Sequence, residues 1–392
     1  MPDRRVVVTG AGVVAPCGIG RSAYWDGLLR TPAEGLRRIE DFDPEPYFEN
    51  PKEARRSDRF TQFALAAAAE ALEHSGLQAD PARVGVNIAT GVGGLGTLEE
   101  QILVNYEKGS RRVSPFLVPM MMGNAASAAV SMRHGFQGPC ETTVTACAAS
   151  THSIGSAMRY IRWDLVDVMV VGGAEAAMTP TALAGFGNMT ALSNSGVSRP
   201  FDAGRDGFVM AEAAGVLVLE ELGHARRRGA NIIGEILGAG NNADAHHITA
   251  PSPGGVGAIR CMQLALADAG LTTADITHIN AHGTSTPLND AAEADAIGVV
   301  FGADGPAVTS TKGVTGHALG AAGAIEAIAV LLAMEHRTIP PTACTSTVDP
   351  ELFPIDLVLG SPRPWEPGYA LSNSFGFGGH NGSLVIGPPP VD

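Results

Sequence analysis

Hydrophobic and polar positions along this chain follow two rhythms. Short uninterrupted apolar runs, rich in Val, Ile and Ala and bounded by glycine or polar residues, are typical of buried strands. They predict strands at residues 5–14, 84–89, 168–173, 215–220, 232–238, 276–281, 307–310, 357–359, 370–372 and 383–386. Longer segments, with apolar residues spaced by three and four positions, predict helices at residues 24–29, 60–74, 148–162, 255–269, 289–300 and 318–334.

The alternation of strands and helices indicates an α/β fold with helices covering buried, mostly parallel strands. The alternation starts again near residue 241, so we expect two similar halves, residues 1–240 and 241–392. Each half has one helix of mostly small residues, at 148–162 and at 318–334. Such helices suit a central layer that packs on all sides. No low-complexity linker separates the halves, so we expect one rigid body.

Composition and charge narrow the class of protein. The 392 residues, 45% of them hydrophobic, exceed the usual size of a single core, and the formal net charge of −14 argues against nucleic acid or an anionic membrane as a partner. The uncharged run at 113–132 contains prolines and polar residues, so no membrane span is expected. Five scattered cysteines fit neither a disulfide framework nor a zinc site. Together with a start that lacks a signal-peptide pattern, they predict a cytoplasmic protein.

The segment Thr-Val-Thr-Ala-Cys-Ala-Ala-Ser, residues 143–150, lies between a predicted strand end and a helix. Cys147 is therefore expected at a helix N-terminus, where unpaired N–H groups and the helix dipole favour negative charge. A thiol in that place should have a lowered pKa and more of the nucleophilic thiolate. The alternative is a buried, inert cysteine, since free cysteines are among the most buried residues.

Two histidines favour the reactive interpretation. His282 directly follows a predicted strand, and His317 directly precedes a predicted helix. α/β folds place reactive groups at strand ends and helix starts. A cysteine together with two histidines is a set of side chains that acyl-thioester chemistry uses. A metal site made of Cys147, His282 and His317 is the alternative, although the ligands are not closely spaced and a fourth is missing.

Three further patterns have structural interpretations. Gly10 and Gly12 begin a dinucleotide-binding pattern, but its third glycine is missing. His246 and His247 are adjacent, so their side chains diverge and we expect them in a loop. His278 lies inside a predicted strand and is expected to be a hydrogen-bonded structural residue rather than a ligand.

Near the C-terminus, residues 373–381 read Asn-Ser-Phe-Gly-Phe-Gly-Gly-His-Asn. Glycines on both sides of Phe377 allow unusual backbone angles and a close approach of the chain. One interpretation is a simple junction between strand and turn. The functional interpretation is a backbone N–H donor beside a thioester, next to a mobile aromatic ring.

Together these motifs resemble the elongating β-ketoacyl-acyl-carrier-protein synthases, condensing enzymes with a thiolase-like fold. The matching segments span nearly the whole chain: residues 145–148, 172–175, 199–202, 205–208, 280–286, 312–323 and 372–381. The resemblance implies two similar α/β halves in α-β-α-β-α layers. It also implies a decarboxylative Claisen condensation of an acyl-enzyme with malonyl carrier protein, in fatty-acid or polyketide biosynthesis. No cofactor is expected beyond the phosphopantetheine on which the carrier holds its substrates.

The resemblance also assigns catalytic roles. Cys147 is the nucleophile, and His282 and His317 promote decarboxylation and stabilise the enolate oxygen. Lys312 and Glu326 organise the surroundings of these histidines. Neutral histidines can donate to an oxyanion without burying net charge, which an arginine could not do.

Further residues are matched to binding roles. Backbone N–H groups of Cys147 and Phe377 form the oxyanion hole, while Thr284, Thr286 and Phe375 contact the substrate arm. No metal is required, but some relatives hold a monovalent cation at the positions matching Asn280, Glu326, Ser372 and Asn373.

The partner implied is an acidic acyl carrier protein, which this acidic chain repels at long range. A local basic patch is then needed, and residues 52–59 contain four positive and two negative side chains. We expect docking at Lys52, Arg55 and Arg56, with Arg199 as a further contact implied by the resemblance. The alternative is an ordinary solvated entrance to the helix at 60–74.

Relatives are two-fold dimers whose strands near residues 141–145 pair across the axis, so a homodimer is expected and a heterodimer is the alternative. A non-elongating partner subunit of a heterodimeric polyketide synthase is a second candidate function, but such subunits lack the nucleophile that Cys147 supplies. A thiolase-type enzyme acting on coenzyme A esters is a third. It would need a second catalytic cysteine, and Cys344 does not lie in such a motif.

Overall fold

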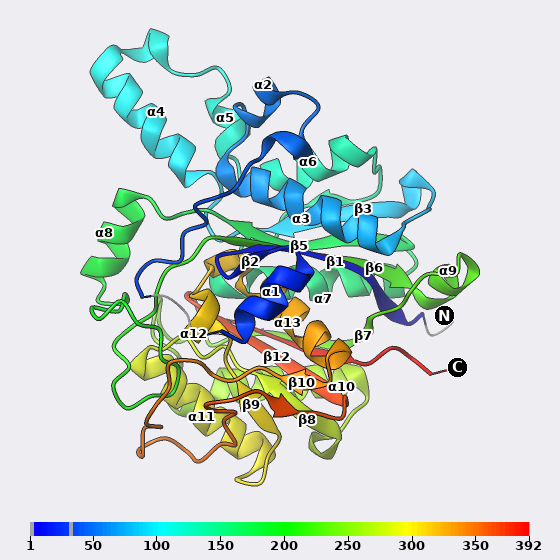
Figure 1. Ribbon diagram of the computed structural model, residues 1–392, viewed down its shortest axis with the longest axis vertical. Coiled ribbons are helices and arrows are strands. Elements are labelled where there is room, and N and C mark those ends of the chain that lie inside the picture. Colours follow the sequence, from blue (N-terminus) through cyan, green and yellow to red (C-terminus); the bar gives the residue numbers. More distant parts are fainter. Residues whose placement is uncertain (1–3, 31–33, 392) are drawn as a thin grey trace.

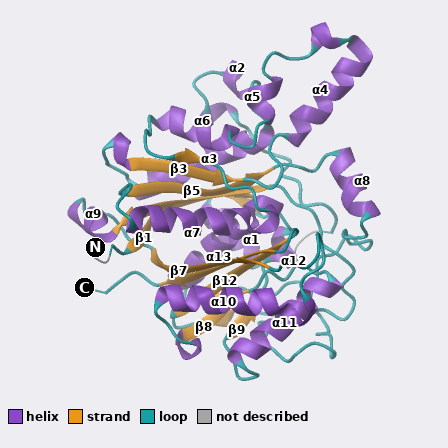
Figure 2. Ribbon diagram, turned by 180° about the vertical axis from the view of Figure 1, so that it is seen from behind, coloured by secondary structure: helices purple, strands orange, loops and turns teal. Residues whose placement is uncertain are grey.

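The computed structural model describes residues 4–30 and 34–391, and its elements form five alternating layers of helices and strands (Figure 1). The layers contain three pairs of helices: α3 (Arg59–Ser75) and α6 (Ala125–His134), α7 (Ala149–Arg162) and α13 (Ala322–Glu335), and α10 (Val256–Ala269) and α11 (Pro287–Phe301). Figure 2 shows the same order from behind, with α7 and α13 in the middle layer. The predicted α-β-α-β-α arrangement is confirmed.

Within the described residues, an 11-stranded sheet supplies the two strand layers. One part contains β4 (Cys140–Glu141), β3 (Val84–Ala89), β5 (Val168–Glu175), β6 (Ala213–Glu221) and β1 (Val6–Ala15), with β2 (Gly18–Ile19) paired to β1. The other contains β7 (Gly234–Ala243), β13 (His380–Gly387), β12 (Tyr369–Gly376), β8 (Ile276–Asn280) and β9 (Ala307–Thr309). A short seam, Val7 with Glu235 and Val8 with Gly234, joins the parts.

The direction of strand pairing differs from the prediction. β3 runs parallel to β4 and β5, and β8 runs parallel to β9 and β12. The pairs β1–β6, β5–β6, β1–β7, β7–β13 and β12–β13 are antiparallel. The expectation of mostly parallel pairing is therefore wrong. Helices cover both faces of the strands, so even the antiparallel ones are uniformly apolar and cannot be distinguished from parallel ones by their sequence.

The two central helices join the halves into one core. α13 is buried on all sides except at its last residue and packs against β1, β5 and β6 of the first half as well as β12 of its own. In return, α7 packs against β7 and β13 of the second half. The predicted boundary at residue 240 falls inside β7, and division of the chain there stays a prediction.

Several elements were not predicted. The projecting helix α4 (Leu95–Lys108), α6, and α8 (Pro180–Asn188) lie where no helix was expected. Only one residue of α4 is buried and none of α8, so neither has the apolar periodicity of a core helix. The strand predicted at 357–359 is wrong, because Leu357 makes only an isolated bridge to Val308.

The shorter elements complete the chain. The remaining short helices are α1 (Arg21–Leu28), α2 (Pro51–Ala54), α5 (Leu117–Met121), α9 (Leu222–Arg227) and α12 (Lys312–Thr315), and β10 (Thr338–Ile339) pairs with β11 (Arg363–Pro364). The uncharged run at 113–132 forms α5 and part of α6. In the described part of the chain, no helix combines the length and apolarity that crossing a membrane requires.

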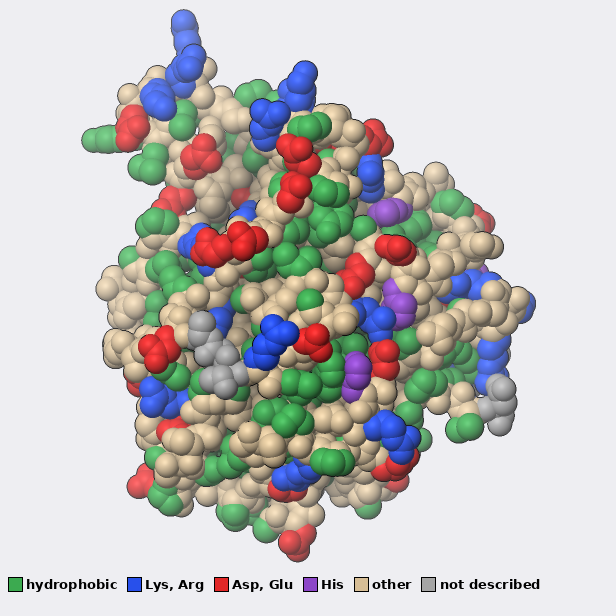
Figure 3. Space-filling model, viewed as in Figure 1, with side chains coloured by type: hydrophobic (Ala, Val, Ile, Leu, Met, Phe, Trp, Pro, Cys, Tyr) green, Lys and Arg blue, Asp and Glu red, His purple; other side chains and the backbone are tan. Residues whose placement is uncertain are grey.

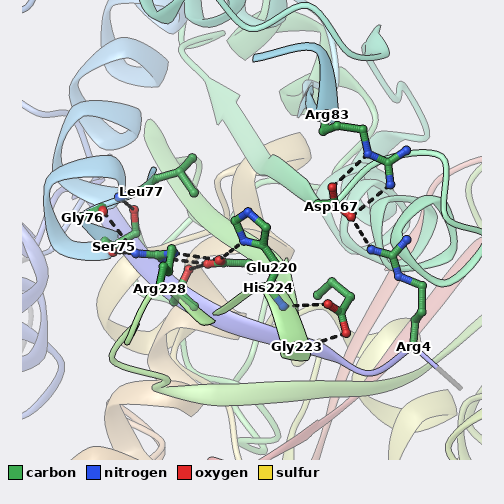
Figure 4. A network of polar contacts seen from close by, with 12 residues as sticks. Arg4, Ser75, Gly76, Leu77, Arg83, Asp167, Glu220, Gly223, His224 and Arg228 are labelled. Carbon is green, nitrogen blue, oxygen red and sulfur yellow. Dashed lines mark hydrogen bonds and ion pairs between the residues drawn. The ribbon is translucent and has the colours of Figure 1, made fainter. Parts of the chain in front are cut away.

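A polar network fastens β6 to its neighbours away from the cavity (Figure 4). The buried Glu220 carboxylate receives two hydrogen bonds of 2.7 Å from Arg228, one from the Thr9 hydroxyl and a contact from His224. Arg228 also donates to the Ser75 carbonyl at the end of α3. These charge-assisted bonds lower the pKa of Glu220 despite its burial, and they fix helix α3 to the sheet.

Candidate active site

A cavity of about 570 Å³ lies where the two halves meet. Cys147 lines it together with His282, His317, Phe375 and Phe377, so both halves contribute to its walls. Cys147 is the only cysteine among the described residues that line the cavity. The predicted constellation, which is spread over more than two hundred positions of sequence, therefore converges at one place.

The nucleophile position is a sharp corner before α7. A 3-10 turn, η4 (Ala146–Ala148), precedes the helix, and Ala146 has φ of 49°. A residue with a side chain in this left-handed region is strained and persists only when its surroundings hold it. As predicted, Cys147 lies at the start of the helix. Its side chain is buried and lines the cavity.

The predicted lowering of the Cys147 pKa is wrong. Burial raises the pKa of the thiol to about 11, and this outweighs the opposing effects of the Lys312 ammonium and of the Phe377 N–H. Glu175 adds a further upward contribution. The helix start was visible in the sequence, but the depth of burial depends on distant segments that cover the thiol.

The two histidines face the thiol and each other. The ligand atoms of Cys147, His282 and His317 all lie within 4.8 Å of one another, and the imidazole rings are 5.3 Å apart at an interplanar angle of 83°. Burial, followed by the nearby Lys312 charge, lowers the pKa of both histidines well below its usual value. Both are therefore neutral and can act as hydrogen-bond donors without a net charge.

Lys312 and Glu326 form a buried ion pair beside His282. The Lys312 ammonium contacts Glu326 Oε1 and lies 3.5 Å from His282 Nδ1, and both side chains are about 1% exposed. Burial raises the pKa of Glu326 to about 7, with Lys312 opposing the shift. The pair places a positive charge next to His282 while keeping the site nearly neutral overall.

The two segments predicted to carry the oxyanion-hole donors lie together. The backbone N–H groups of Phe377 and of Cys147 itself both act to lower the pKa of the Cys147 thiol, against the larger effect of burial. The two segments approach closely at Gly376, where a Cβ atom would lie 3.1 Å from Cys147 N and 3.2 Å from Ala148 N. Glycine at this position is what allows the Phe377 N–H to reach the nucleophile.

The residues matched to substrate binding also line the cavity. The hydroxyls of Thr284 and Thr286 lie 2.9 Å apart on one wall, and the Phe375 ring lies 6.0 Å from the His282 ring. Apolar side chains of Phe186, Met189 and Phe208 line another part. The cavity thus combines a polar wall with an apolar one, which suits an arm carrying amide groups and an acyl chain.

The residues matched to a cation site lie together in the core. Asn280 Nδ2 donates to Ser372 Oγ at 3.3 Å, and Asn373 Oδ1 accepts from Ser383. Two buried oxygens of this set, Asn280 Oδ1 and Glu326 Oε2, have no hydrogen-bond partner among the described residues. Unpaired oxygen acceptors next to a carboxylate are the ligands that hard cations prefer, so the residues present fit a monovalent cation.

Three residues of the basic patch are exposed on one short segment, and the fourth, Arg59, is bound elsewhere. Lys52, Arg55 and Arg56 are exposed on and after α2, and the Arg56 guanidinium stacks on Phe116 at 4.4 Å (Figure 3, where Lys and Arg side chains gather over α2). Arg59 instead pairs with the buried Glu212.

Arg199, matched to the same docking role, is half-buried and donates to Ser195 Oγ at 3.0 Å. Within the described part of the chain, the hydrogen bonds that it donates go to Ser285 and Ser195 and none joins it to α2.

Two predictions concern other histidines. His246 and His247 are exposed in the loop after β7, as predicted. His278 is buried in β8, but neither of its ring nitrogens has a hydrogen-bond partner within the described residues. The expectation of a hydrogen-bonded histidine is therefore wrong. Burial alone lowers the pKa of His278 to about 3.

Three buried residues that support the site were not predicted. Glu293 on α11 accepts the backbone N–H groups of His282 and Gly283 at 2.8 and 2.7 Å. Glu175, at the end of β5, accepts the N–H groups of Gly91 at 2.6 Å and Gly320 at 3.0 Å. The third, His152, lies on α7. The motif ending in Glu175 was a signal for that residue. Nothing local marked the other two.

Nearly the whole chain is similar to proteins of one family. The model of the β-ketoacyl synthase N-terminal domain matches residues 31–225, and that of the C-terminal domain matches residues 233–345. A 3-oxoacyl-[acyl-carrier-protein] synthase 2 from Synechocystis sp. is 44% identical over 411 residues, covering 98% of each chain.

Two solved structures cover 99% of this chain and 100% of their own. The ishigamide ketosynthase/chain length factor is 34% identical with a TM-score of 0.91. A type II polyketide ketosynthase in complex with its acyl-carrier protein is 31% identical with a TM-score of 0.89.

Proposed function

This chain belongs to the β-ketoacyl synthase family and is a 3-oxoacyl-[acyl-carrier-protein] synthase of fatty-acid biosynthesis, and we propose that Cys147 is its acyl-accepting nucleophile. Such enzymes are acyltransferases that join an acyl group to a malonyl unit. The observation that carries the assignment of residues is the convergence of Cys147, His282 and His317, with ligand atoms within 4.8 Å, at one cavity.

In the first half-reaction the Cys147 sulfur attacks the carbonyl carbon of the acyl thioester. The new C–S bond forms as the bond to the phosphopantetheine sulfur breaks, and the thiol proton leaves with that sulfur. A neutral histidine can relay this proton, since both ring nitrogens exchange protons readily. The N–H groups of Cys147 and Phe377 stabilise the tetrahedral oxyanion, a contribution of about 3–4 kcal/mol for a single donor in comparable sites.

In the second half-reaction the malonyl group loses carbon dioxide. The electrons of the broken C–C bond move to the thioester, and His282 and His317 donate hydrogen bonds to the resulting enolate oxygen. The enolate carbon then attacks the acyl-Cys147 carbonyl, the new C–C bond forms, and the cysteine leaves as a thiolate that regains one proton. Lys312 and Glu326 hold the His282 side of this site in position.

We propose that no redox cofactor takes part and that both substrates arrive on phosphopantetheine. Asn280, Glu326, Ser372 and Asn373 would hold a monovalent cation, whose charge would satisfy the two unpaired oxygens and stiffen the strand ends next to His282. Its role would be structural rather than chemical.

Docking of an acidic carrier protein is proposed at Lys52, Arg55 and Arg56, because these cations are exposed together. The test is Arg55→Glu, compared with Arg227→Glu on α9 as a control of the same total charge. Arg55→Glu should raise KM for carrier-bound substrate about fivefold, mainly through the encounter rate, while small thioester mimics react at the parent rate. Equal losses with both substrate types would make the patch structural.

We propose a homodimer. β4 is an exposed edge strand, and exposed apolar side chains lie around it and on the neighbouring helices: Ile102, Leu103, Tyr106, Val118, Met132 and Val144. Unpaired strand edges with apolar surroundings are usually covered. Light scattering at micromolar concentration should give about twice the 40.3 kDa chain mass. A fully active monomer would contradict the proposal. A doubled mass that is seen only when a second, different subunit is present would favour a heterodimer.

The remaining alternatives are weaker. A non-elongating subunit would not need Cys147, and a thiolase would need a second cysteine in the cavity, where the described residues place none besides Cys147. One of the two solved structures compared above is a type II polyketide ketosynthase, so a polyketide role stays a second proposal. Free thiols at all five cysteines suit the reducing cytoplasm that we propose as its location.

The test of the nucleophile is peptide mapping by mass spectrometry after incubation with hexanoyl carrier protein. We expect Cys147 to be the only acylated thiol, and Cys147→Ala to take no label while Cys140→Ser takes the parent amount. Acylation of Cys140 or Cys344 with Cys147 unmodified would overturn the assignment.

A further inference from the structure

His152 is a buried side chain of α7 to which the proposed mechanism gives no role, and it does not line the cavity. Its Nδ1 lies 2.8 Å from Thr145 Oγ1, and its Nε2 lies 2.9 Å from the Asn381 carbonyl oxygen. A carbonyl only accepts, so Nε2 carries the proton. Burial lowers the pKa of His152, so the ring is neutral and Nδ1 accepts from the Thr145 hydroxyl. Both nitrogens are bonded, in one tautomer.

The two partners of His152 belong to the two segments that carry the oxyanion-hole donors. Thr145 is two residues before Cys147, with the strained Ala146 between them. Asn381 is four residues after Phe377 and lies in β13, just past the turn that connects it to β12. One imidazole therefore connects the corner holding one donor with the hairpin holding the other.

The packing around the ring leaves little freedom. A Cβ at Gly382 would lie 3.0 Å from His152 Cδ2 and 3.1 Å from its Nε2, so the hairpin approaches this side of the ring closely. Ala146 has φ of 49°, and a strained corner needs surrounding contacts to hold it. Thr151, the preceding residue on α7, also bonds the hairpin, through Ser374 Oγ at 2.8 Å, but within the described residues its hydroxyl makes no hydrogen bond to the corner.

We propose that His152 is a positioning residue that fixes the Cys147 N–H relative to the Phe377 N–H, so that both donors reach the same thioester oxygen. This rests on the proposed acyl transfer to Cys147. The physical reason is that donors in an oxyanion hole act only at the position of the developing charge. Removing one such donor slows comparable enzymes about 10²–10³-fold, and a displacement of about 1 Å can cost about 10²-fold.

Three variants separate the two bonds. His152→Ala removes both, His152→Asn keeps an amide oxygen near the Nδ1 position for Thr145, and His152→Gln keeps an amide nitrogen near the Nε2 position for Asn381. Thr151→Val is the matched control, since it breaks another bond between α7 and the same hairpin. The acyl donor is p-nitrophenyl hexanoate, an activated ester that needs no carrier docking.

We expect His152→Ala to lower the acylation rate constant of Cys147 about 30- to 100-fold, with KM for the ester within about twofold of the parent. His152→Asn and His152→Gln should each lose about 3- to 10-fold, and Thr151→Val less than about twofold. Alkylation of Cys147 by iodoacetamide develops no carbonyl oxyanion, so a displaced Phe377 N–H affects it only through the thiol pKa, and its rate should fall far less than the acylation rate in the three His152 variants.

Parallel losses of alkylation and acylation, an equal loss in Thr151→Val, or parent acylation in His152→Ala would overturn the proposal. Each rate is divided by the fraction of folded protein, which is measured by thermal melting. A variant that is merely less stable then shows the parent rate per folded molecule, and this result would also contradict the proposal. A parent enzyme that reacts with the ester but takes no acyl group from carrier protein would contradict the proposed function instead, and the comparison of variants would still decide the role of His152.

Discussion

The two central helices, α7 and α13, begin in the same way but have different roles. A 3-10 turn precedes each helix, η4 before α7 and η7 (Leu319–Ala321) before α13, and the first residue of each turn has a positive φ, 49° at Ala146 and 44° at Leu319. The second residue of the turn is Cys147 in the first half and Gly320 in the second. The same backbone turn therefore presents the proposed nucleophile in the first half and, in the second half, an N–H group that binds Glu175.

The first turns of the helices differ in chemistry. α7 begins with buried polar side chains that bond to neighbouring segments: Ser150 accepts from Ala324 N at 2.9 Å, and Ser153 donates to Asn87 O at 2.6 Å. α13 begins with Ala and Gly and carries one buried acid, Glu326, which is paired with Lys312. The helix of the proposed nucleophile is therefore fixed in place by hydrogen bonds, whereas the partner helix supplies the carboxylate that pairs with Lys312 beside His282.

The largest effect should come from removing the histidines of the second half. His282→Ala and His317→Ala should each reduce decarboxylation of malonyl carrier protein about 10³-fold, because the enolate loses a donor, while part of the acyl transfer to Cys147 remains. The measurement is carbon dioxide release beside single-turnover acylation. If either variant released carbon dioxide at the parent rate, the proposed assignment of decarboxylation to the histidines of the second half would be wrong.

The next effect concerns stability. Lys312→Met should lower the free energy of unfolding at pH 8 by about 3–5 kcal/mol, because Glu326 is left buried and unpaired. The loss should shrink at pH 5.5, where Glu326, with its raised pKa, becomes protonated. The double variant Lys312→Met with Glu326→Leu should recover most of the stability in urea unfolding. A double variant no more stable than the single one would show that the pair is not the cause.

A third prediction tests the nucleophile's own environment. Because the raised pKa of Cys147 lies near 11, the thiolate fraction should grow about tenfold per pH unit, and iodoacetamide alkylation should rise about 100-fold from pH 7 to pH 9. A control reaction with free cysteine levels off above its lower pKa. A plateau for Cys147 below pH 8 would instead show that the helix start outweighs burial.

The smallest effect is on stability and compares two buried histidines. Both ring nitrogens of His152 are hydrogen-bonded, whereas in the part of the chain that the structure describes neither of those of His278 is. His278→Leu should stabilise the protein by about 1 kcal/mol at pH 7, because it removes unpaired buried nitrogens, whereas His152→Leu should destabilise it.

The sign of the pH dependence follows from the pKa of His278. Its folded value of about 3 is below the unfolded value, so below pH 6.5 the unfolded parent binds a proton that the folded parent does not. The advantage of His278→Leu should therefore widen by up to about 1.4 kcal/mol per pH unit as the pH falls. Melting curves at pH 5.5 and 7 measure this, and a gap that narrows on acidification would contradict it.

The core elements could be predicted because long apolar patterns determine them. β3 spans Val84–Ala89, the predicted residues, and α3 differs from its prediction by one residue at each end. α4 and α8 could not be predicted, because they are exposed and lack a core-facing stripe. Strand direction depends on which segments become neighbours, and no local pattern records it.

The candidate site was visible where chemistry and local structure coincide. Cys147 lies just before α7, His282 just after β8, and His317 between α12 and the 3-10 turn that precedes α13, and the structure brings the three together. The pKa of Cys147 could not be predicted, because the segments that bury it come from elsewhere in the chain. His152 was missed for a similar reason, since its partner Asn381 lies 229 positions away.

The crossed packing of the central helices has a consequence for how the chain can be divided. α13 fills the first half's core and α7 touches the second half's strands, so a fragment containing either half alone would expose a large apolar surface. The halves are therefore obligate complements rather than independent folding units. A chain cut at the exposed Gly229, between α9 and β7, should reassemble into an active enzyme only when both fragments refold together.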